Sequence, residues 1–390
     1  MVMRSVLVRL LEWRARRFSD PADRLQFLRR SVSGPVAKPR RLRRALEHLP
    51  VLTIAFGLVL AAGVLLTSGR HALGVTATAN SRPAAPDRKL ADASYTAAPV
   101  SRVWLVQSNP QFDLYSNGLR VENQYATSAQ PRHYLALART ATGASEWRTE
   151  PAGIVFHTTE SHMAPFEEDQ NQMLRRAGEG LLEFVQRQRA YHFVIDRFGR
   201  VFRVVRETDC ANHAGNSVWA DESWIYVYLN RSFLGVAFEA QSNPRAGDAA
   251  VNAAQVHAAR ILTEMLRSRY DIPAANCVTH AQVSVNPGNW RAGYHTDWAA
   301  NLPFRELGLS NNYREPPASV LLFGFRSDSL LAQSGGAGVT PGVEAAEGQL
   351  RAEAAARGLT LDLYRERLQR RYRDAIRALA EKSAPEEYNE

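Results

Sequence analysis

Two segments about 120 residues apart end in histidine, a residue type that binds metal ions. The first segment ends at His157 and the second at His280, and a third polar segment carries His295 and Asp297. Two imidazoles and one carboxylate that converge on a zinc ion leave its fourth position open to water. That arrangement is typical of catalytic rather than structural zinc sites. The residue types therefore predict a zinc hydrolase, provided that folding brings these segments together.

Both histidines follow short runs of β-branched or aromatic residues, so each is expected at the end of a strand. Between residues 150 and 310 such strand patterns alternate with helix patterns. We expect strands at 154–157, 191–196, 201–205, 234–238 and 276–280, and helices at 167–190 and 252–270. Gly199 lies in the turn of a hairpin between the second and third of these strands. The pattern predicts a mixed α/β fold with a central β-sheet flanked by helices.

The flanking regions have different compositions. Short strand-like runs occupy residues 101–150, so we expect one domain over 101–327 with a β extension before its 150–310 core. Residues 328–345 are rich in glycine and are expected to be a linker. The C-terminal segment 346–382 contains apolar residues that step by three and four. It is expected to form a helix that packs on the domain or on a protein partner.

The N-terminal part predicts a membrane anchor. Residues 49–67 contain no charge and have the length of a helix that crosses a bilayer. The basic cluster Lys38–Arg44 predicts that residues 1–48 stay in the cytoplasm. The linker 68–100 and the domain would then lie on the outer side of the inner membrane, in the periplasm or facing the cell wall. A signal peptide cleaved near Ala79 and a buried core helix are the alternatives.

The net charge of +9 does not indicate nucleic-acid binding. Residues 1–48 hold 13 Lys and Arg against 4 Asp and Glu, which already accounts for +9. The remaining 35 residues of each sign cancel, so the predicted domain has no basic excess for a nucleic acid.

The sequence contains only two cysteines, Cys210 and Cys277. An exported domain would permit a disulfide between them. Two separate buried thiols fit the sequence as well, so the pairing stays open.

Five blocks occur in one order along residues 153–305. They are the first histidine after its strand, Tyr191-His-Phe-Val-Ile-Asp-Arg-Phe-Gly199, Asn212-His-Ala-Gly-Asn-Ser217, Asn230-Arg-Ser-Phe-Leu-Gly-Val236, and the second histidine. In this order they resemble the zinc-dependent N-acetylmuramoyl-L-alanine amidases of the type-2 amidase family, which includes the peptidoglycan recognition proteins. The resemblance covers about 150 residues and implies the fold of that family.

The resemblance implies roles for the metal site. His157 and His280 correspond to zinc ligands, and Asp297 to the third ligand. His295 stands where the family usually has lysine, and the gap from His280 to Asp297 is longer than expected. A second possibility is that His295 binds the metal and Asp297 is its hydrogen-bonding partner.

The resemblance also implies a catalytic group. Ala237 occupies the position at which some relatives have a glutamate, and others rely on the tyrosine that corresponds to Tyr191. Glu239 lies two residues further along the expected strand and would face the same side. We therefore expect Glu239 or Tyr191 to orient the attacking water, and a protonated His295 to stabilise the oxyanion.

The implied substrate is peptidoglycan or a muropeptide, cut between N-acetylmuramic acid and L-alanine. His213, Asn216 and Trp219 match a segment that lines the substrate groove in the family. Two alternatives stay open. One is a peptidoglycan-binding or regulatory module that keeps the fold without turnover, and the other is a zinc amidase that acts on a different amide.

Overall fold

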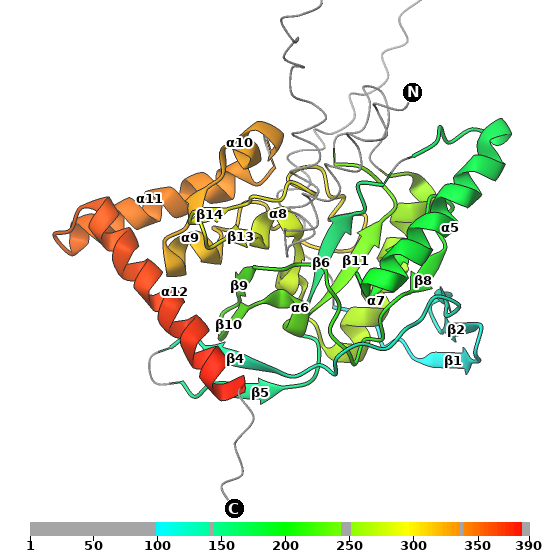
Figure 1. Ribbon diagram of the computed structural model, residues 1–390, viewed down its shortest axis with the longest axis horizontal. Helices are drawn as coiled ribbons and strands as arrows, with labels where there is room; N and C mark the ends of the chain where they lie inside the picture. Colours follow the sequence, from blue (N-terminus) through cyan, green and yellow to red (C-terminus); the bar gives the residue numbers. More distant parts are fainter. Residues whose placement is uncertain (1–98, 141–142, 162, 243–250, 336–337, 384–390) are drawn as a thin grey trace, which may run out of the picture. The chain divides into compact units, whose positions relative to one another are not determined.

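The computed structural model describes residues 99–140, 143–161, 163–242, 251–335 and 338–383 (Figure 1). The expected cytoplasmic segment, the membrane anchor at 49–67 and nearly all of the 68–100 linker lie outside these residues. Within the described residues, no helix combines the length and the apolar composition needed to cross a bilayer.

A mixed eight-stranded sheet forms the centre of the domain, with strand order β1-β2-β3-β8-β7-β11-β6-β12. The strands are β1 (Leu105–Ser108), β2 (Phe112–Tyr115), β3 (Arg120–Glu122), β6 (Gly153–Thr158), β7 (Phe193–Ile195), β8 (Val201–Arg203), β11 (Phe233–Phe238) and β12 (Cys277–Thr279). The four strands β7, β11, β6 and β12 run parallel to one another. The expected central sheet is confirmed, and the N-terminal β extension adds β1, β2 and β3 to one end of it.

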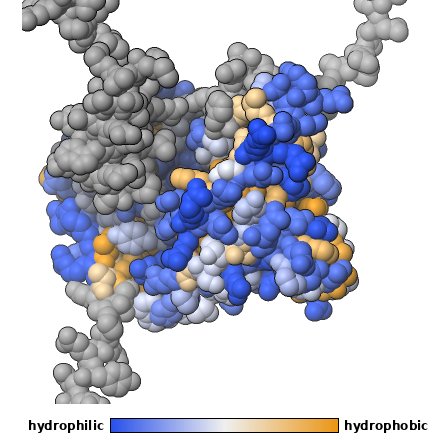
Figure 2. All heavy atoms as spheres, turned by 45° about the vertical axis from the view of Figure 1, so that its right-hand side comes forward, coloured by the Kyte–Doolittle hydropathy of each residue, from blue (hydrophilic) through white to orange (hydrophobic). Residues whose placement is uncertain are grey.

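Two long helices cover opposite faces of this sheet (Figure 1). They are α5 (Asn171–Gln188) and α7 (Ala253–Tyr270), close to the expected helices. Leu182 of α5 packs with Val194 and Ala237, whereas Leu262 of α7 packs with Val236. Neighbouring residues of a strand point to opposite faces, so β11 serves both layers. Figure 2 turns the right-hand side of Figure 1 toward the reader. The surface of the described residues seen there is mostly hydrophilic, with small hydrophobic patches.

A second, antiparallel sheet has the strand order β5-β4-β10-β9. Its strands are β4 (Tyr134–Ala138), β5 (Glu146–Arg148), β9 (Val218–Ala220) and β10 (Trp224–Val227). Short helical turns connect the larger elements: η1 (Glu168–Gln170), α6 (Leu229–Ser232), η2 (Ala274–Asn276) and α8 (His280–Val283). Since α8 begins at His280, the second histidine lies where a strand of the central sheet turns into a helix.

The C-terminal helices pack on the domain. They are α9 (Ala318–Phe323), α10 (Ser329–Gly335), α11 (Thr340–Ala356) and α12 (Leu361–Ser383). Tyr372 of α12 packs edge-on against Phe323 and Phe325. A small sheet of β13 (Val285–Asn286), β14 (Arg291–Ala292) and β15 (Arg326–Ser327) joins this region to the segment after His280. Of the two expectations for the C-terminal helix, packing on the domain is the one that the structure shows.

The expected linker at 328–345 is corrected by the structure, because α10 and the start of α11 lie there. Two of its glycines, Gly338 and Gly342, permit close packing. A Cβ on Gly338 would lie 2.2 Å from the carbonyl oxygen of Ala299, and one on Gly342 would lie 2.5 Å from that of Glu315. Backbone passes too close to these positions for any side chain, and composition alone does not reveal such contacts.

The two cysteines are separate thiols. Cys277 is buried on β12, and burial raises the pKa of its thiol to about 12. Cys210 is partly exposed, and its Sγ lies 3.8 Å from the carbonyl oxygen of Pro131.

Two glycines of α11 provide a matched test of this packing. An alanine at Gly348 would meet no atom within 4 Å, so Gly348→Ala should stabilise the protein by up to about 1 kcal/mol through helix propensity. Gly342→Ala forces its Cβ against rigid backbone and should destabilise by about 1–3 kcal/mol. Urea unfolding of both variants measures the change in the free energy of unfolding and its sign. Equal stabilisation by both would contradict the close packing of α11.

Candidate active site

The parallel pairing of β6 with β12 brings the two histidines together. Thr279 pairs with Phe156, so the next residues, His280 and His157, leave neighbouring strands at equivalent positions. Their ring centroids are 4.5 Å apart. Both side chains are buried at the carboxyl ends of the strands, which is where open α/β sheets bind ligands.

Asp297 lies between the two imidazoles. Its Oδ2 is 3.0 Å from Nδ1 of His157, and its Oδ1 is 2.9 Å from Nδ1 of His280. The carbonyl oxygen of Asp297 accepts a 3.2 Å hydrogen bond from the amide of Ala281, which ties the segment to α8. Burial alone would raise the pKa of Asp297, but His280 and the hydrogen bonds of both imidazoles hold it well below its usual value. The Asp297 carboxylate therefore carries a negative charge at neutral pH and could offer an oxygen to a metal ion.

The three side chains fit a zinc ion. Their donor atoms all lie within 4.8 Å of one another, and the two contacts to the carboxylate measure 3.0 and 2.9 Å. Tetrahedral zinc with bonds of about 2.1 Å separates neighbouring ligand atoms by roughly 3.4 Å, so small shifts would suffice. Two histidines with one carboxylate are also a known catalytic donor set. The geometry is shown, and zinc binding by these residues stays a prediction.

The other ring nitrogen of His157 contacts a further histidine, His213. Nε2 of His157 lies 3.1 Å from Nδ1 of His213, and Nε2 of His213 lies 3.2 Å from the carbonyl oxygen of Phe233. Burial, followed by the proximity of His280, lowers the pKa of His157 to about 4. The ring is therefore neutral at neutral pH. His213 was expected in the substrate groove. The structure places it against the predicted ligand His157, and its contact with a substrate stays a prediction.

His295 stacks on His280, with ring centroids 4.3 Å apart and planes 19° from parallel. It is not part of the three-residue donor cluster, in which Asp297 is the third member. Burial, followed by the proximity of His280, lowers the pKa of His295 to about 3. This direction of the pKa favours a neutral imidazole over a protonated one, and the role of His295 at an oxyanion stays a prediction.

Tyr191 lies over the cluster. Its ring centroid is 5.1 Å from that of His157, and its backbone adopts the left-handed φ of 61°. Such strain in a non-glycine residue gathers at functional sites. Burial, followed by the charges of Asp297 and Glu160, raises the pKa of Tyr191 well above its usual value. Tyr191 is therefore a proton donor, and Glu160 is a neighbouring carboxylate that the sequence pattern did not single out.

Glu239 faces the same side of β11 as Ala237 but is engaged elsewhere. Its Oε2 accepts a 3.1 Å hydrogen bond from the amide of Arg197, and a Cβ on Gly178 of α5 would lie 3.5 Å from it. Burial raises the pKa of Glu239. Within the described residues, the structure shows no contact between Glu239 and the donor cluster, so its role as a base stays a prediction without geometric support.

The other two expected substrate residues differ in exposure. Asn216 is exposed, so its side chain is free to meet a substrate, and that role stays a prediction. Trp219 is buried at 5% exposure, and its Nε1 donates a 3.0 Å hydrogen bond to Asn276. The structure thus gives the Trp219 ring a place in the core, where it cannot contact a substrate.

Asn230 is a residue whose role the sequence did not reveal. Its Oδ1 accepts hydrogen bonds from the amides of His213, Ala214 and Gly215, at 2.9, 2.6 and 3.2 Å. One side chain thus fixes the loop that carries His213. The Asn that opens the Asn230–Val236 block was the available signal, but its partners lie in a different block.

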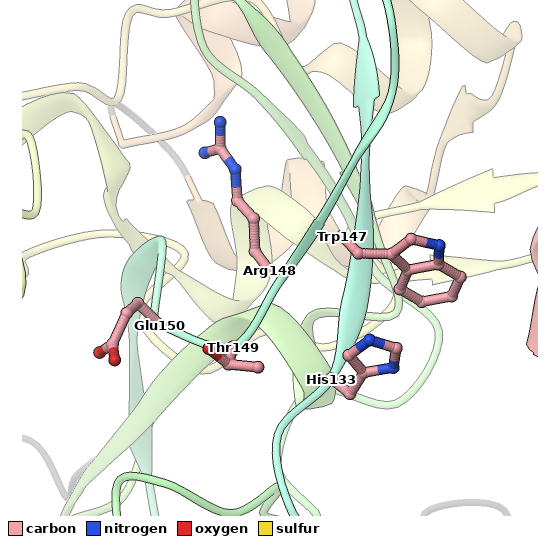
Figure 3. Close-up of a pocket in the computed structure, with 5 residues that line it drawn as sticks. All are labelled: His133, Trp147, Arg148, Thr149 and Glu150. Carbon is pink, nitrogen blue, oxygen red and sulfur yellow. The ribbon is translucent and has the colours of Figure 1, made fainter.

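A surface hollow of about 380 Å³ is lined by residues other than those of the donor cluster. It is formed by His133, Trp147, Arg148, Thr149 and Glu150 (Figure 3). The rings of His133 and Trp147 stack with centroids 4.3 Å apart. No predicted site residue contributes to it, so the hollow is not the candidate active site.

The fold and the donor cluster define an α/β domain with the arrangement of a catalytic metal site. Residues 147–297 match the family model described as N-acetylmuramoyl-L-alanine amidase, and this segment belongs to the type-2 amidase family. The match begins in β5 and ends at Asp297, so it contains all three members of the cluster. No match was found among curated proteins.

Several solved structures are similar to the chain at low identity. AMPDH3 from Pseudomonas aeruginosa, in complex with anhydromuramic pentapeptide, is 22% identical over 44% of this chain and 64% of its own, with a TM-score of 0.31. AmiD from E. coli, in complex with the substrate anhydro-N-acetylmuramic acid-L-Ala-D-gamma-Glu-L-Lys, is 18% identical over 51% and 65%, with a TM-score of 0.31. Drosophila peptidoglycan recognition protein SD is 18% identical over 41% and 84%, with a TM-score of 0.25. The chain thus spans slightly less than two thirds of the first two proteins.

The loop held by Asn230 can be tested by mutation. Asn230→Ala removes the acceptor of three amides and should destabilise the protein by about 1–3 kcal/mol. Asn230→Asp keeps an oxygen at the same position and should lose much less. Chemical unfolding compares the two variants with the parent protein. Equal losses would show that the carbonyl group of Asn230 is not what fixes the loop.

Proposed function

We propose that this protein is a zinc-dependent amidase that hydrolyses the bond between N-acetylmuramic acid and L-alanine in peptidoglycan or muropeptides. The observation that carries this proposal is the convergence of His157, His280 and Asp297 at the carboxyl ends of β6 and β12, within a segment of the type-2 amidase family. The family supports the reaction class, and the donor cluster supports the metal.

In this proposal the zinc ion, when bound, activates water and polarises the scissile carbonyl. Nδ1 of His157, Nδ1 of His280 and the carboxylate of Asp297 would hold it. Tyr191 keeps its phenol proton and donates a hydrogen bond from Oη to the carbonyl oxygen as negative charge develops there. His295 contributes a neutral ring that packs on His280 and keeps its orientation.

A second candidate is a peptidoglycan-binding or regulatory module on the same fold. Two features favour it: burial lowers the pKa of His295 where the family usually has a cation, and Ala237 stands where some relatives have a glutamate. Binding without turnover would follow if these groups were needed for the chemistry. The two candidates share the metal site and differ only in whether peptides are released.

The N-terminal residues are proposed to anchor the protein in the inner membrane, with the domain on the cell-wall side. The support is the uncharged run at 49–67 after a basic segment. Extraction of the full-length protein from membranes by carbonate washing would overturn this proposal.

The amidase assay uses matched histidine variants. The protein should bind one equivalent of zinc and release stem peptides from purified sacculi. His157→Ala should lose both, because it removes one of three ligands. His257→Ala changes an exposed histidine of α7 and should retain both. Zinc binding and sacculus binding without peptide release would favour the second candidate.

The catalytic donor is tested by two further changes. Tyr191→Phe removes only the phenol hydroxyl and should lower kcat by about 10²–10³-fold, as expected for the loss of one oxyanion donor. Glu239→Gln should change kcat far less, because the carboxylate is engaged with Arg197 beneath α5. Steady-state kinetics at saturating zinc measure both variants. The reverse order of effects would assign the catalytic role to Glu239.

A further inference from the structure

We propose that His213 is a positioning residue that sets which nitrogen of His157 faces the metal site, through a chain of hydrogen bonds that starts at the carbonyl oxygen of Phe233. This inference rests on the proposed metal site, and it replaces the expected role of His213 in binding the substrate.

The direction of the chain follows from its first member. The carbonyl oxygen of Phe233 can only accept, so Nε2 of His213, 3.2 Å away, carries the proton. A neutral imidazole has one proton, which leaves Nδ1 of His213 as an acceptor. When a metal ion is bound, Nε2 of His157, 3.1 Å away, then donates to it. The lone pair of His157 is left on Nδ1, where the metal would take the place of the 3.0 Å hydrogen bond between Nδ1 and Asp297.

The surroundings of His213 are built to hold its ring at this position. A Cβ on Gly235 would lie 2.6 Å from Cγ of His213, so only glycine lets the ring reach β11. On the other side, Asn230 fixes the backbone of His213 and of the two residues that follow. Phe233, Gly235 and Asn230 all come from one short segment. That segment therefore supplies the hydrogen-bond acceptor, the space and the anchor for a single imidazole.

A direct role of His213 in substrate binding fits this geometry poorly. Both of its ring nitrogens have partners inside the protein, Nδ1 with His157 and Nε2 with Phe233. A substrate could use the ring only by breaking one of these contacts. Partners of this kind on metal-binding histidines fix the ring and its tautomer, and their loss weakens metal affinity by about 10–100-fold.

The test measures zinc affinity by competition with a chelator, in the whole protein and without substrate. His213→Leu removes both hydrogen bonds and should weaken zinc binding by about 10–100-fold. His213→Gln can accept from His157 through Oε1 and donate to Phe233 through Nε2, so it should stay within a few-fold of the parent. The visible spectrum of the cobalt-loaded protein should change in the leucine variant and be preserved in the glutamine variant.

Kinetics at saturating zinc separate the two roles. A positioning role leaves the KM for a muropeptide unchanged in His213→Gln, whereas a substrate contact raises it. Unchanged zinc affinity in His213→Leu, or an equal loss in both variants, would overturn the inference. If the leucine variant does not fold, Gly235→Ala displaces the ring with His213 intact and should weaken zinc binding in the same way. An unchanged affinity in Gly235→Ala would also count against the inference. A parent protein that binds no zinc would instead overturn the proposed function.

Discussion

The register of β12 on β6 is the constraint on which the candidate site depends. Because Thr279 pairs with Phe156 in a parallel ladder, His280 and His157 must emerge together at one end of the sheet. A shift of one residue would turn one imidazole toward the opposite face, where α7 packs. The buried apolar residues of both strands resist such a shift, so the same burial that stabilises the sheet also places the two histidines.

The neighbouring pair, β6 with β11, extends this control to the surroundings of His157. Ala237 pairs with His157, and its small side chain packs under α5 without crowding the ring. Two residues earlier on the same face, Gly235 leaves space for His213. Side chains of β11 alternate between the two faces of the sheet. One face packs in the core with α7, and the other leaves space beside His157 and His213. The continuous apolar sequence of β11 therefore has two structural roles.

The long gap between His280 and Asp297 has a structural explanation. The extra residues form β13 and β14, and β14 pairs with β15 of the C-terminal region. Trp290, in the left-handed conformation between these strands, packs against Phe325 and Tyr372 of that region. The segment that returns to Asp297 is thereby braced by α12. The C-terminal helices, which looked separable in sequence, are part of the frame that positions the third member of the cluster.

The strands and helices of the core could be predicted because their apolar periodicity is a local property, and so could the three members of the donor cluster, which lie in recognisable blocks. The errors arose where a residue's behaviour depends on partners distant in sequence. The pKa of His295 is lowered by its burial and then by the ring of His280 stacked on it, and the Trp219 ring is held in the core by its hydrogen bond to Asn276. Gly342 marks close packing only because the backbone at Glu315 passes beside it. A residue type limits the chemistry that a side chain can perform, but tertiary contacts decide its protonation state and whether a substrate can reach it. For that reason the three members of the donor cluster could be inferred before the fold was known, whereas the contacts that His213 makes around them could not.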